Sequence, residues 1–235
     1  MEKKQYNFNI SNNHILININ NGNYVIDTGS PSSFFYDVDT IMINDKEYRG
    51  NRQLVDRQHI EKLVGTTVNG LIGLDIISIS GITFDFLNNI ITFDVKEGHV
   101  CYFLKNDKGY YYTKDCVINN KILETTIIDS GACISYVNKK YLDSSQETDE
   151  KYSDYNPSVG DISGNYYEVS IDKVTLGSGS YHHTIKVGRM NDDIEKIALG
   201  ADAVIGLLDI VKNEDRLAPN KTVSIDTMRN VLYIS

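Results

Sequence analysis

The hydrophobic residues of the first half of the chain alternate with polar residues over short stretches, which is the pattern of half-buried β-strands. Residues 15–19 alternate in this way, the turn sequence Asn20-Asn21-Gly22-Asn23 follows, and the apolar run Tyr24-Val25-Ile26 returns. Residues 82–86 and 90–94 form a second pair of alternating stretches. These pairs predict antiparallel hairpins, so the chain is expected to be rich in β-structure.

The second half of the chain repeats three segments of the first half in the same order. The run Tyr24-Val25-Ile26-Asp27-Thr28-Gly29-Ser30 returns 102 positions later as Thr126-Ile127-Ile128-Asp129-Ser130-Gly131-Ala132. Leu71-Ile72-Gly73 returns after 133 positions as Val204-Ile205-Gly206, and the hairpin of residues 82–94 returns after 141 positions. Three matched segments in one order indicate an internal duplication.

The duplication predicts two similar β lobes, which we place at residues 1–98, carrying Asp27, and at residues 99–235, carrying Asp129. The offset between the repeats grows after the acid, so the second lobe carries extra residues around 143–172. Each acid follows a buried strand and enters a glycine turn, and two such turns can face each other if the lobes pack about a twofold axis.

Composition and charge exclude several classes of partner. The chain has 235 residues, a formal net charge of −9 and a pI near 5.0. It has no basic cluster, so neither nucleic acid nor an anionic membrane is expected to bind it. No apolar run approaches a membrane span or the core of a signal peptide, so a cytoplasmic location is expected, or a secreted one if an upstream segment was removed. Helical spacing is only fair at residues 51–64, so few short helices are expected.

The cysteines and histidines offer little additional chemistry. Cys101, Cys116 and Cys133 are too few for a disulfide framework, and we expect reduced thiols. Cys133 follows the second acidic turn directly, so it is either a reactive thiol or, as we favour, a small buried apolar residue. His182-His183 has no second cluster of ligands at a suitable spacing. No metal and no cofactor are expected.

The two acids suggest a specific chemistry if they meet. One Val-Ile-Asp-Thr-Gly sequence alone is an ordinary entry of a strand into a turn, and the repetition is what favours a pair. Carboxylates about 3 Å apart cannot both ionise at low cost, so Asp27 and Asp129 would share one proton. Such a pair can activate one water, with one carboxyl as base and the other as acid. The proton would belong to the pair and not to either residue.

At these residues the chain resembles a known family. Asp27-Thr28-Gly29-Ser30 and Asp129-Ser130-Gly131-Ala132, each followed by an apolar-apolar-glycine segment, resemble the bilobal aspartic proteases of the pepsin and retropepsin clan. The resemblance covers residues 14–94 and 116–235. It implies an all-β, pepsin-like acid protease fold with two pseudo-twofold-related lobes and few short helices. The chain is shorter than digestive pepsins and is similar to a compact, bacterial-type, single-chain form.

The resemblance also assigns support of the catalytic turns to seven residues: Thr28, Gly29, Ser30, Ser130, Gly131, Gly73 and Gly206. In that family the glycine after the apolar pair threads behind the turn, and the hydroxyls that follow the acids cross-link the two turns. The Ser30 hydroxyl would bond to its own acid, Asp27. Ala132 lacks this hydroxyl, so the pair is expected to be slightly asymmetric.

The flap, a hairpin that covers the substrate in this family, is expected in the second lobe. The first lobe has only a hairpin near Asn44-Asp45-Lys46, so a first-lobe flap can be absent altogether. In residues 159–171, Ser163-Gly164-Asn165 lies between alternating stretches and predicts a hairpin tip. Gly164, with Tyr166 or Tyr167 beside it, is therefore expected to contact the substrate.

Three functions remain open. The first is a monomeric aspartic endopeptidase that cleaves an extended peptide or protein substrate, with a mildly acidic optimum and residual activity at neutral pH. The second is a catalytically weak or inactive peptide-binding module on the same fold, since fold does not fix activity. The third is an unrelated β protein with two chance acidic turns, which would hold the two carboxylates far apart.

Overall fold

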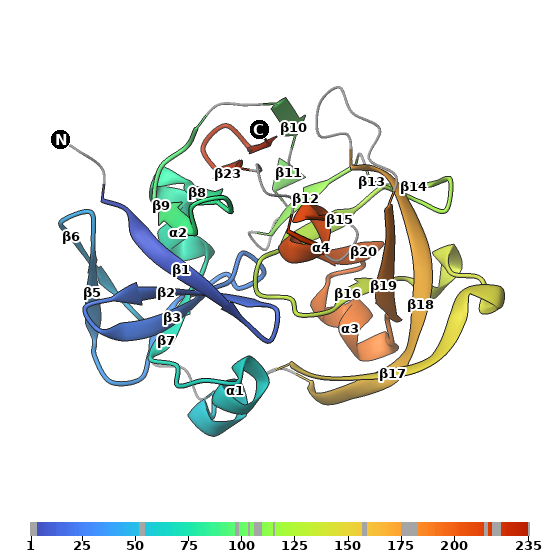
Figure 1. The fold of residues 1–235 in the computed structure, drawn as a ribbon, viewed down its shortest axis with the longest axis horizontal. Helices are drawn as coiled ribbons and strands as arrows, with labels where there is room; N and C mark the ends of the chain where they lie inside the picture. The colour runs from blue at the N-terminus through green and yellow to red at the C-terminus, as the bar shows by residue number, and fades with distance from the viewer. Residues whose placement is uncertain are drawn as a thin grey trace.

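The computed structural model describes residues 4–51, 55–96, 99–102, 104–105, 110–114, 116–156, 159–174, 183–213, 216–217 and 222–234. His182 of the His182-His183 pair lies outside these residues. Short strands dominate the described chain and its helices are short, as Figure 1 shows. The prediction of an all-β chain with few short helices is confirmed.

The described residues of the first half form nine strands and two α-helices. The strands are β1 (Tyr6–Ser11), β2 (His14–Ile19), β3 (Gly22–Ile26), β4 (Phe34–Phe35), β5 (Thr40–Ile43), β6 (Lys46–Arg49), β7 (Gly70–Ile72), β8 (Ile82–Asp85) and β9 (Ile90–Thr92). The helices are α1 (Arg57–Val64) and α2 (Leu74–Ser80). Helix α1 begins where the Asp56 carboxylate accepts the Gln58 N–H, and it ends at Gly65, whose φ of 79° suits glycine.

The second half forms fifteen strands, two α-helices and two 3₁₀ turns among the described residues. The first strands are β10 (His99–Tyr102), β11 (Leu104–Lys105), β12 (Tyr111–Thr113), β13 (Cys116–Ile118), β14 (Lys121–Leu123), β15 (Thr126–Asp129) and β16 (Ser135–Val137). The later strands are β17 (Glu147–Asn156), β18 (Gly160–Val174), β19 (His183–Arg189), β20 (Ala203–Gly206), β21 (Lys212–Asn213), β22 (Arg216–Leu217), β23 (Thr222–Asp226) and β24 (Val231–Ile234). The helical elements are η1 (Lys139–Tyr141), η2 (Ser144–Gln146), α3 (Asp192–Ile197) and α4 (Leu207–Val211).

One large sheet contains strands from both ends of the chain. Its order is β10-β24-β23-β8-β9-β1-β2-β3-β7-β4, so the last two strands of the chain join the sheet of the first half. The division of the chain after residue 98 therefore stays a prediction, because sheet pairing crosses it.

The two closing hairpins pair with each other in a way that shows the duplication. Strands β8 and β23 are antiparallel, and Thr83 lies opposite Ser224. These two residues are equivalent in the repeats, 141 positions apart, and their hydroxyl oxygens lie 2.7 Å apart. Equivalent residues can face each other across antiparallel strands only at a local twofold axis, so the two halves are related by a pseudo-twofold rotation.

The second large sheet has the order β11-β12-β15-β20-β16-β19-β18-β13-β14, and β17 pairs with β18. In Figure 1, β17 extends along the lower edge of the molecule from the second-half sheet toward helix α1 of the first half. The extra residues of the second half therefore build a long hairpin that reaches the other lobe.

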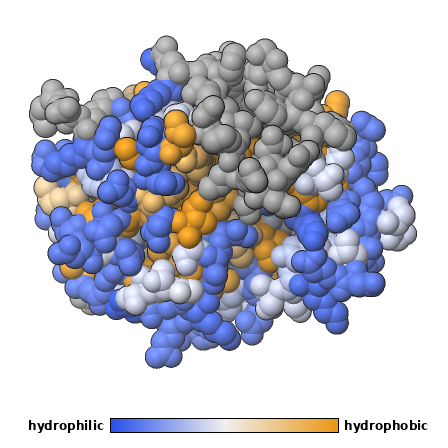
Figure 2. Space-filling view, in the orientation of Figure 1, coloured by the Kyte–Doolittle hydropathy of each residue, from blue (hydrophilic) through white to orange (hydrophobic). Residues whose placement is uncertain are grey.

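The core consists mainly of isoleucine side chains on the inner faces of the sheets. Ile15, Ile17, Ile72 and Ile205 are among those with no exposed surface, and one continuous cluster of buried residues includes members from both halves. Burying such side chains contributes about 1.5–3 kcal/mol each relative to exposure. On the face shown in Figure 2, hydrophobic residues are visible in the middle of the molecule while polar residues dominate the periphery.

Candidate active site

Each acid lies where a buried strand ends beside a parallel neighbour. Strand β3 runs parallel to β7, and the Asp27 N–H donates to the Ile72 carbonyl oxygen at 3.0 Å. Strand β15 runs parallel to β20 and places Asp129 opposite Gly206. The strand therefore fixes where each acid stands, and the turn after it fixes the direction of the carboxyl group.

The two turns are cross-linked by four buried hydrogen bonds that obey the pseudo-twofold symmetry. The Thr28 N–H donates to Ser130 Oγ at 3.0 Å, and the Ser130 N–H donates to Thr28 Oγ1 at 2.9 Å. The Thr28 hydroxyl donates to the Ile128 carbonyl oxygen at 3.0 Å, and the Ser130 hydroxyl donates to the Ile26 carbonyl oxygen at 2.9 Å. This is the cross-link that the family resemblance implies for these two residues.

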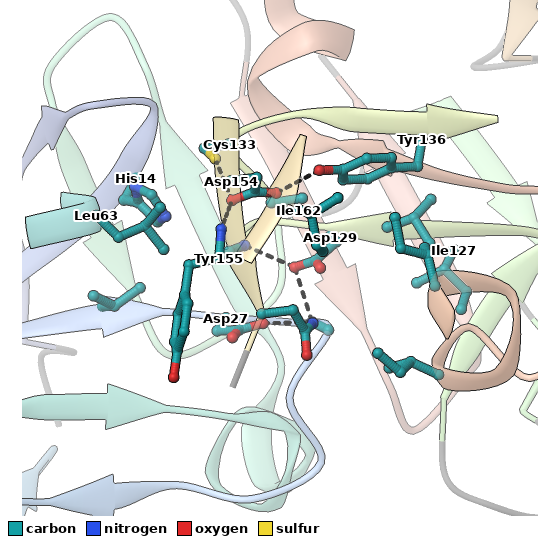
Figure 3. A pocket seen from close by; sticks show the side chains of 18 of the residues that line it. His14, Asp27, Leu63, Ile127, Asp129, Cys133, Tyr136, Asp154, Tyr155 and Ile162 are labelled. Atoms are coloured by element: carbon teal, nitrogen blue, oxygen red, sulfur yellow. Dashed lines mark hydrogen bonds between the residues drawn. The ribbon is translucent and has the colours of Figure 1, made fainter. Parts of the chain in front are cut away.

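The carboxyl groups of Asp27 and Asp129 lie close to each other and share a backbone donor. The Gly29 N–H lies 2.8 Å from Asp27 Oδ1 and 3.1 Å from Asp129 Oδ1, and the Gly131 N–H donates to Asp129 Oδ1 at 2.7 Å. Figure 3 shows the two acids facing each other at one end of a cavity. The structure thus brings the two acids together, which removes the hypothesis of two distant acidic turns.

The environment of the pair favours a bound proton. Burial raises the pKa of the Asp27 carboxyl well above its usual value, and the charge of Asp129 raises it further. Burial also raises the pKa of Asp129, against the lowering effect of hydrogen bonds from the Gly131 N–H and from Asp27. The cause in both cases is that a second negative charge cannot be solvated in this space, so the pair retains one proton.

The two turn glycines are required by the closeness of the opposite acid. A Cβ atom on Gly29 would lie 2.2 Å from Asp129 Oδ2, and one on Gly131 would lie 2.4 Å from Asp27 Cγ. Any side chain at these positions would push the acids apart. Each lobe therefore supplies both an acid and the gap that receives the acid of the other lobe.

Gly73 and Gly206 lie behind the turns, and each is held by a serine and an aspartate that the sequence interpretation did not use. The Gly73 N–H donates to Ser33 Oγ at 2.8 Å, and the Ser33 hydroxyl donates to Asp75 Oδ1 at 2.5 Å.

The second lobe repeats this chain of hydrogen bonds, from Gly206 to Ser135 at 2.9 Å and from Ser135 to Asp209 at 2.5 Å. The sequence interpretation assigned no role to Asp75 or Asp209. Their recurrence two or three positions after each glycine was the available signal.

The expected role of the Ser30 hydroxyl is wrong. This hydroxyl donates to the Ser32 carbonyl oxygen at 2.9 Å, and it is the Gly29 backbone N–H that donates to the Asp27 carboxyl, at 2.8 Å. The backbone of the turn already supplies the donors that the carboxyl needs, so the hydroxyl finds a nearer acceptor in its own turn.

The carboxyl pair opens into a cavity of about 180 Å³ with apolar walls from both lobes. Val25 and Ile127 stand two positions before the acids, and Leu71 and Val204 stand two positions before the glycines. Because successive strand residues point to opposite faces, residues two apart share a face, and the repeat places equivalent apolar side chains on both sides of the pair. Tyr110 also lines the cavity, and burial together with the two acids raises its pKa.

The hairpin over the cavity comes from the second half, but its tip is not where the sequence predicts it. Strand β17 pairs with β18 from Glu147 opposite Tyr167 to Asn156 opposite Gly160, and the Val159 N–H donates to the Asn156 carbonyl oxygen at 3.0 Å. The turn therefore lies between Asn156 and Gly160, whose φ is 93°.

The predicted hairpin tip at Gly164, with Tyr166 and Tyr167 beside it, is wrong, because all three lie inside strand β18 and none of them lines the cavity. Gly164 pairs with Tyr152, and a Cβ there would lie 2.9 Å from the Tyr152 hydroxyl oxygen. Tyr167 is buried in the core, and Tyr166 packs on Tyr152 with ring centroids 5.2 Å apart. This glycine makes room for an aromatic ring and does not form a turn.

Tyr155 and Asn156, at the end of β17, line the cavity in place of the predicted residues. The Tyr155 ring stacks on the His59 ring of helix α1, with centroids 4.9 Å apart and planes 9° apart. The end of β17 in one lobe thus packs against helix α1 of the other, and both elements line the cavity. From the first lobe, the described lining residues lie on β2, on β3 with its following turn, on α1 and on β7, and the β5–β6 hairpin does not contribute.

Cys133 is held by a neighbouring carboxylate. Its thiol donates to Asp154 Oδ1 at 3.3 Å, and burial, reinforced by the charge of Asp154, raises the pKa of the thiol. A thiol that stays protonated is a poor nucleophile. The structure therefore does not support the reactive-thiol alternative, although Cys133 is only partly buried and lies at the cavity.

Among the described residues, no group of three or more histidine, cysteine, aspartate or glutamate side chains could hold a metal ion. In the same part of the chain, no helix combines the length and apolar character needed to cross a membrane.

Comparisons with known proteins identify a fold and not a family. No protein-family model matches the chain, and no curated protein sequence matches it. Among solved structures, conglutin gamma, a basic 7S globulin from lupine seeds, matches with a TM-score of 0.53 and 7% identity over 98% of this chain and 94% of that chain. Basic 7S globulin from soybean matches with a TM-score of 0.49 and 10% identity over 98% and 93%. The lupine match, together with the two-lobed topology, confirms the bilobal pepsin-like fold.

Proposed function

We propose that the protein is an aspartic endopeptidase. The observation that carries this proposal is the meeting of Asp27 and Asp129, one from each lobe, as a carboxyl pair that shares the Gly29 N–H and lines a cavity. The raised pKa values favour one shared proton, and this is the protonation state that acid–base catalysis by two carboxyls requires.

The pair would hydrolyse a peptide bond through one water held between the carboxyl groups. The ionised carboxylate takes a proton from the water, and at the same time the water oxygen forms a bond to the peptide carbonyl carbon. The protonated carboxyl donates its proton to the carbonyl oxygen, which gives a neutral tetrahedral intermediate. Proton transfer to the peptide nitrogen and cleavage of the carbon–nitrogen bond then release an amine and a carboxylic acid.

The cavity walls and the hairpin favour an extended substrate. Val25, Leu71, Ile127 and Val204 offer apolar surface on both sides of the carboxyl pair. Among the described strands, β17 pairs only with β18, so its other edge can accept main-chain hydrogen bonds from an added strand. The cavity of about 180 Å³ is smaller than the pockets of about 300–1,000 Å³ that typically hold ligands. The hairpin tip must therefore lift from α1 before a peptide can enter.

A peptide-library digest across pH tests this proposal. We expect cleavage that is strongest at mildly acid pH and persists at neutral pH, because the pair holds its proton more tightly than free carboxylic acids do. A peptide that carries a hydroxyl in place of the scissile carbonyl should inhibit, since it resembles the tetrahedral intermediate. A digest with no new termini at any pH would reject the endopeptidase.

A second candidate function is peptide binding without cleavage on the same fold. The observation that favours it is that conglutin gamma, the similar solved structure from lupine seeds, is a basic 7S globulin. Peptides that bind the purified chain and stay intact at both acid and neutral pH would support this function over the first.

A further inference from the structure

A third carboxylate, that of Asp154, lines the same cavity as the pair. Asp154 lies on β17 two residues before the end of the strand, so the hairpin carries it to the cleft. Figure 3 shows its side chain between Cys133 and Tyr136 and above Asp129. The proposed reaction gives this carboxylate no role.

Within the described part of the chain, the hydrogen bonds to Asp154 all come from uncharged groups. The Tyr136 hydroxyl donates to Oδ2 at 2.7 Å, the Tyr155 N–H donates to Oδ1 at 2.8 Å, and the Cys133 thiol donates to Oδ1 at 3.3 Å. A carboxylate has about four positions that accept hydrogen bonds, two on each oxygen. The oxygen Oδ2 therefore keeps the capacity for a further donor.

Asp154 has no countercharge in the described part of the chain. Neither lysine nor arginine occurs among the described residues that line the cavity, and no salt bridge is formed by Asp154 with another described residue. The basic side chain of the lining is His14, which is 4% exposed. Burial lowers the pKa of His14, although the charges of Asp154 and Asp129 oppose this effect. At neutral pH the cleft therefore carries negative charge without compensation.

We propose that Asp154 makes this cleft select peptides with a lysine or arginine side chain beside the bond to be cut. This inference rests on the proposed function, because it concerns the substrate of the same site. A lysine or arginine side chain combines a long apolar stem with a terminal cation. The apolar walls suit the stem, and Asp154 Oδ2 suits the cation as a charge-assisted acceptor.

The competing explanation is that Asp154 only anchors the hairpin tip to Tyr136. An anchor would affect all peptides alike, because it changes the position of the hairpin and not the charge that the substrate meets. A specificity residue would change the ratio between a charged peptide and its uncharged analogue. The ratio therefore separates the two roles.

The test uses a peptide library with one position fixed in turn as lysine, norleucine or glutamate, so that norleucine keeps the stem of lysine without its charge. Binding is measured with the full chain carrying Asp27→Asn, and cleavage is measured with the otherwise unchanged chain. We expect lysine to be preferred over norleucine by about tenfold at one position next to the scissile bond, as for a close charge pair across an interface. Glutamate should be disfavoured there.

Asp154→Asn keeps the shape of the side chain and should abolish this preference, so that lysine and norleucine peptides bind about equally. The binding of norleucine peptides should be nearly unchanged. The matched control is Asp161→Asn, which removes the same charge from an exposed position opposite Tyr155 on the same hairpin, outside the cavity lining. This control should keep the preference.

Equal binding of lysine and norleucine peptides by the chain that retains Asp154 would overturn the proposal, as would a preference that survives Asp154→Asn. If binding shows the preference but no peptide is cleaved, the specificity stands and the endopeptidase is rejected.

Discussion

Replacing Thr28 by valine tests the cross-link between the two turns, because valine has nearly the shape of threonine and lacks the hydroxyl. In the wild type, Thr28 Oγ1 donates to the Ile128 carbonyl oxygen at 3.0 Å and accepts the Ser130 N–H at 2.9 Å. The Thr28 side chain belongs to a residue that is 5% exposed, and Ser130 is 1% exposed. Water therefore cannot replace the lost partner.

The expected cost follows from the two groups that Thr28→Val leaves unpaired. A buried donor or acceptor without a partner costs about 1–3 kcal/mol, so the two together should cost about 2–6 kcal/mol. The free energy of unfolding of a domain is usually about 5–15 kcal/mol, so this cost is a large part of the total stability. The same cost is expected for Ser130→Ala, since its hydroxyl serves the Ile26 carbonyl oxygen and the Thr28 N–H.

Urea unfolding at constant pH measures this cost as the change in the free energy of unfolding. Thr28→Ser is the control, because it removes a methyl group and retains the hydroxyl, and it should lose much less stability. A loss within about 0.5 kcal/mol for Thr28→Val, as for ordinary surface substitutions, would show that the buried cross-link does not hold the lobes together.

Two further predictions concern the acids themselves. Burial raises the folded-state pKa of Asp27 above its usual value of 3.8, so the folded protein binds this proton more tightly than the unfolded chain does. The wild type should therefore lose stability as the pH rises from about 3.8 through the folded-state pKa. Asp27→Asn has no proton to lose at this position and should lose less stability over the same range. Urea unfolding at a series of pH values measures this, and an equal fall in the free energy of unfolding for both chains would contradict the prediction. Gly131→Ala places a methyl group 2.4 Å from Asp27 Cγ, and we expect a loss of about 1–3 kcal/mol in stability together with most of the peptide cleavage. Ala132→Ser is its control, since Ser30 holds the same place in the other lobe and its hydroxyl finds a carbonyl oxygen; a fully active Gly131→Ala chain would show that the acids need not be so close.

The sequence predicted the centre of the site because the duplication repeats it. Two copies of an acid, a hydroxyl and a glycine after a buried strand already contain the symmetry that brings Asp27 to Asp129. The strand geometry then follows from alternation, which is a local property of the chain. The hydroxyls of Thr28 and Ser130 needed the family resemblance, since their partners are carbonyl groups of the opposite lobe.

The position of the hairpin tip could not be predicted in the same way. A glycine either forms a turn or makes room for a neighbouring side chain inside a strand, and the sequence does not distinguish the two. Gly164 lies inside a strand where the Tyr152 ring leaves no space for a side chain. The sequence at the turn does contain residues that are typical of turns, namely the pair Asn156-Pro157 and Gly160. Only the pairing of β17 with β18 decides between the two glycines, and that pairing depends on contacts between distant residues.

The contributions of Asp154 and Tyr155 to the cleft were also beyond the sequence. Both lie in an acidic, polar stretch that has the composition of a solvated loop. Strand β17 carries them across to the other lobe, where Tyr155 meets His59. A long hairpin can move polar residues into a cleft without any change in their local pattern, so composition alone does not reveal them.

The proposed mechanism requires that Asp27 and Asp129 act together on one water. The most direct measurement is kcat/KM for the best library peptide with wild type, Asp27→Asn, Asp129→Asn and, as control, Asp39→Asn, which changes an exposed acid. Loss of one partner of an acid–base pair costs about 10²–10⁴-fold, so we predict a loss of at least this size in both pair variants and none in the control. Cleavage at the wild-type rate by either pair variant would contradict the proposed two-carboxyl mechanism.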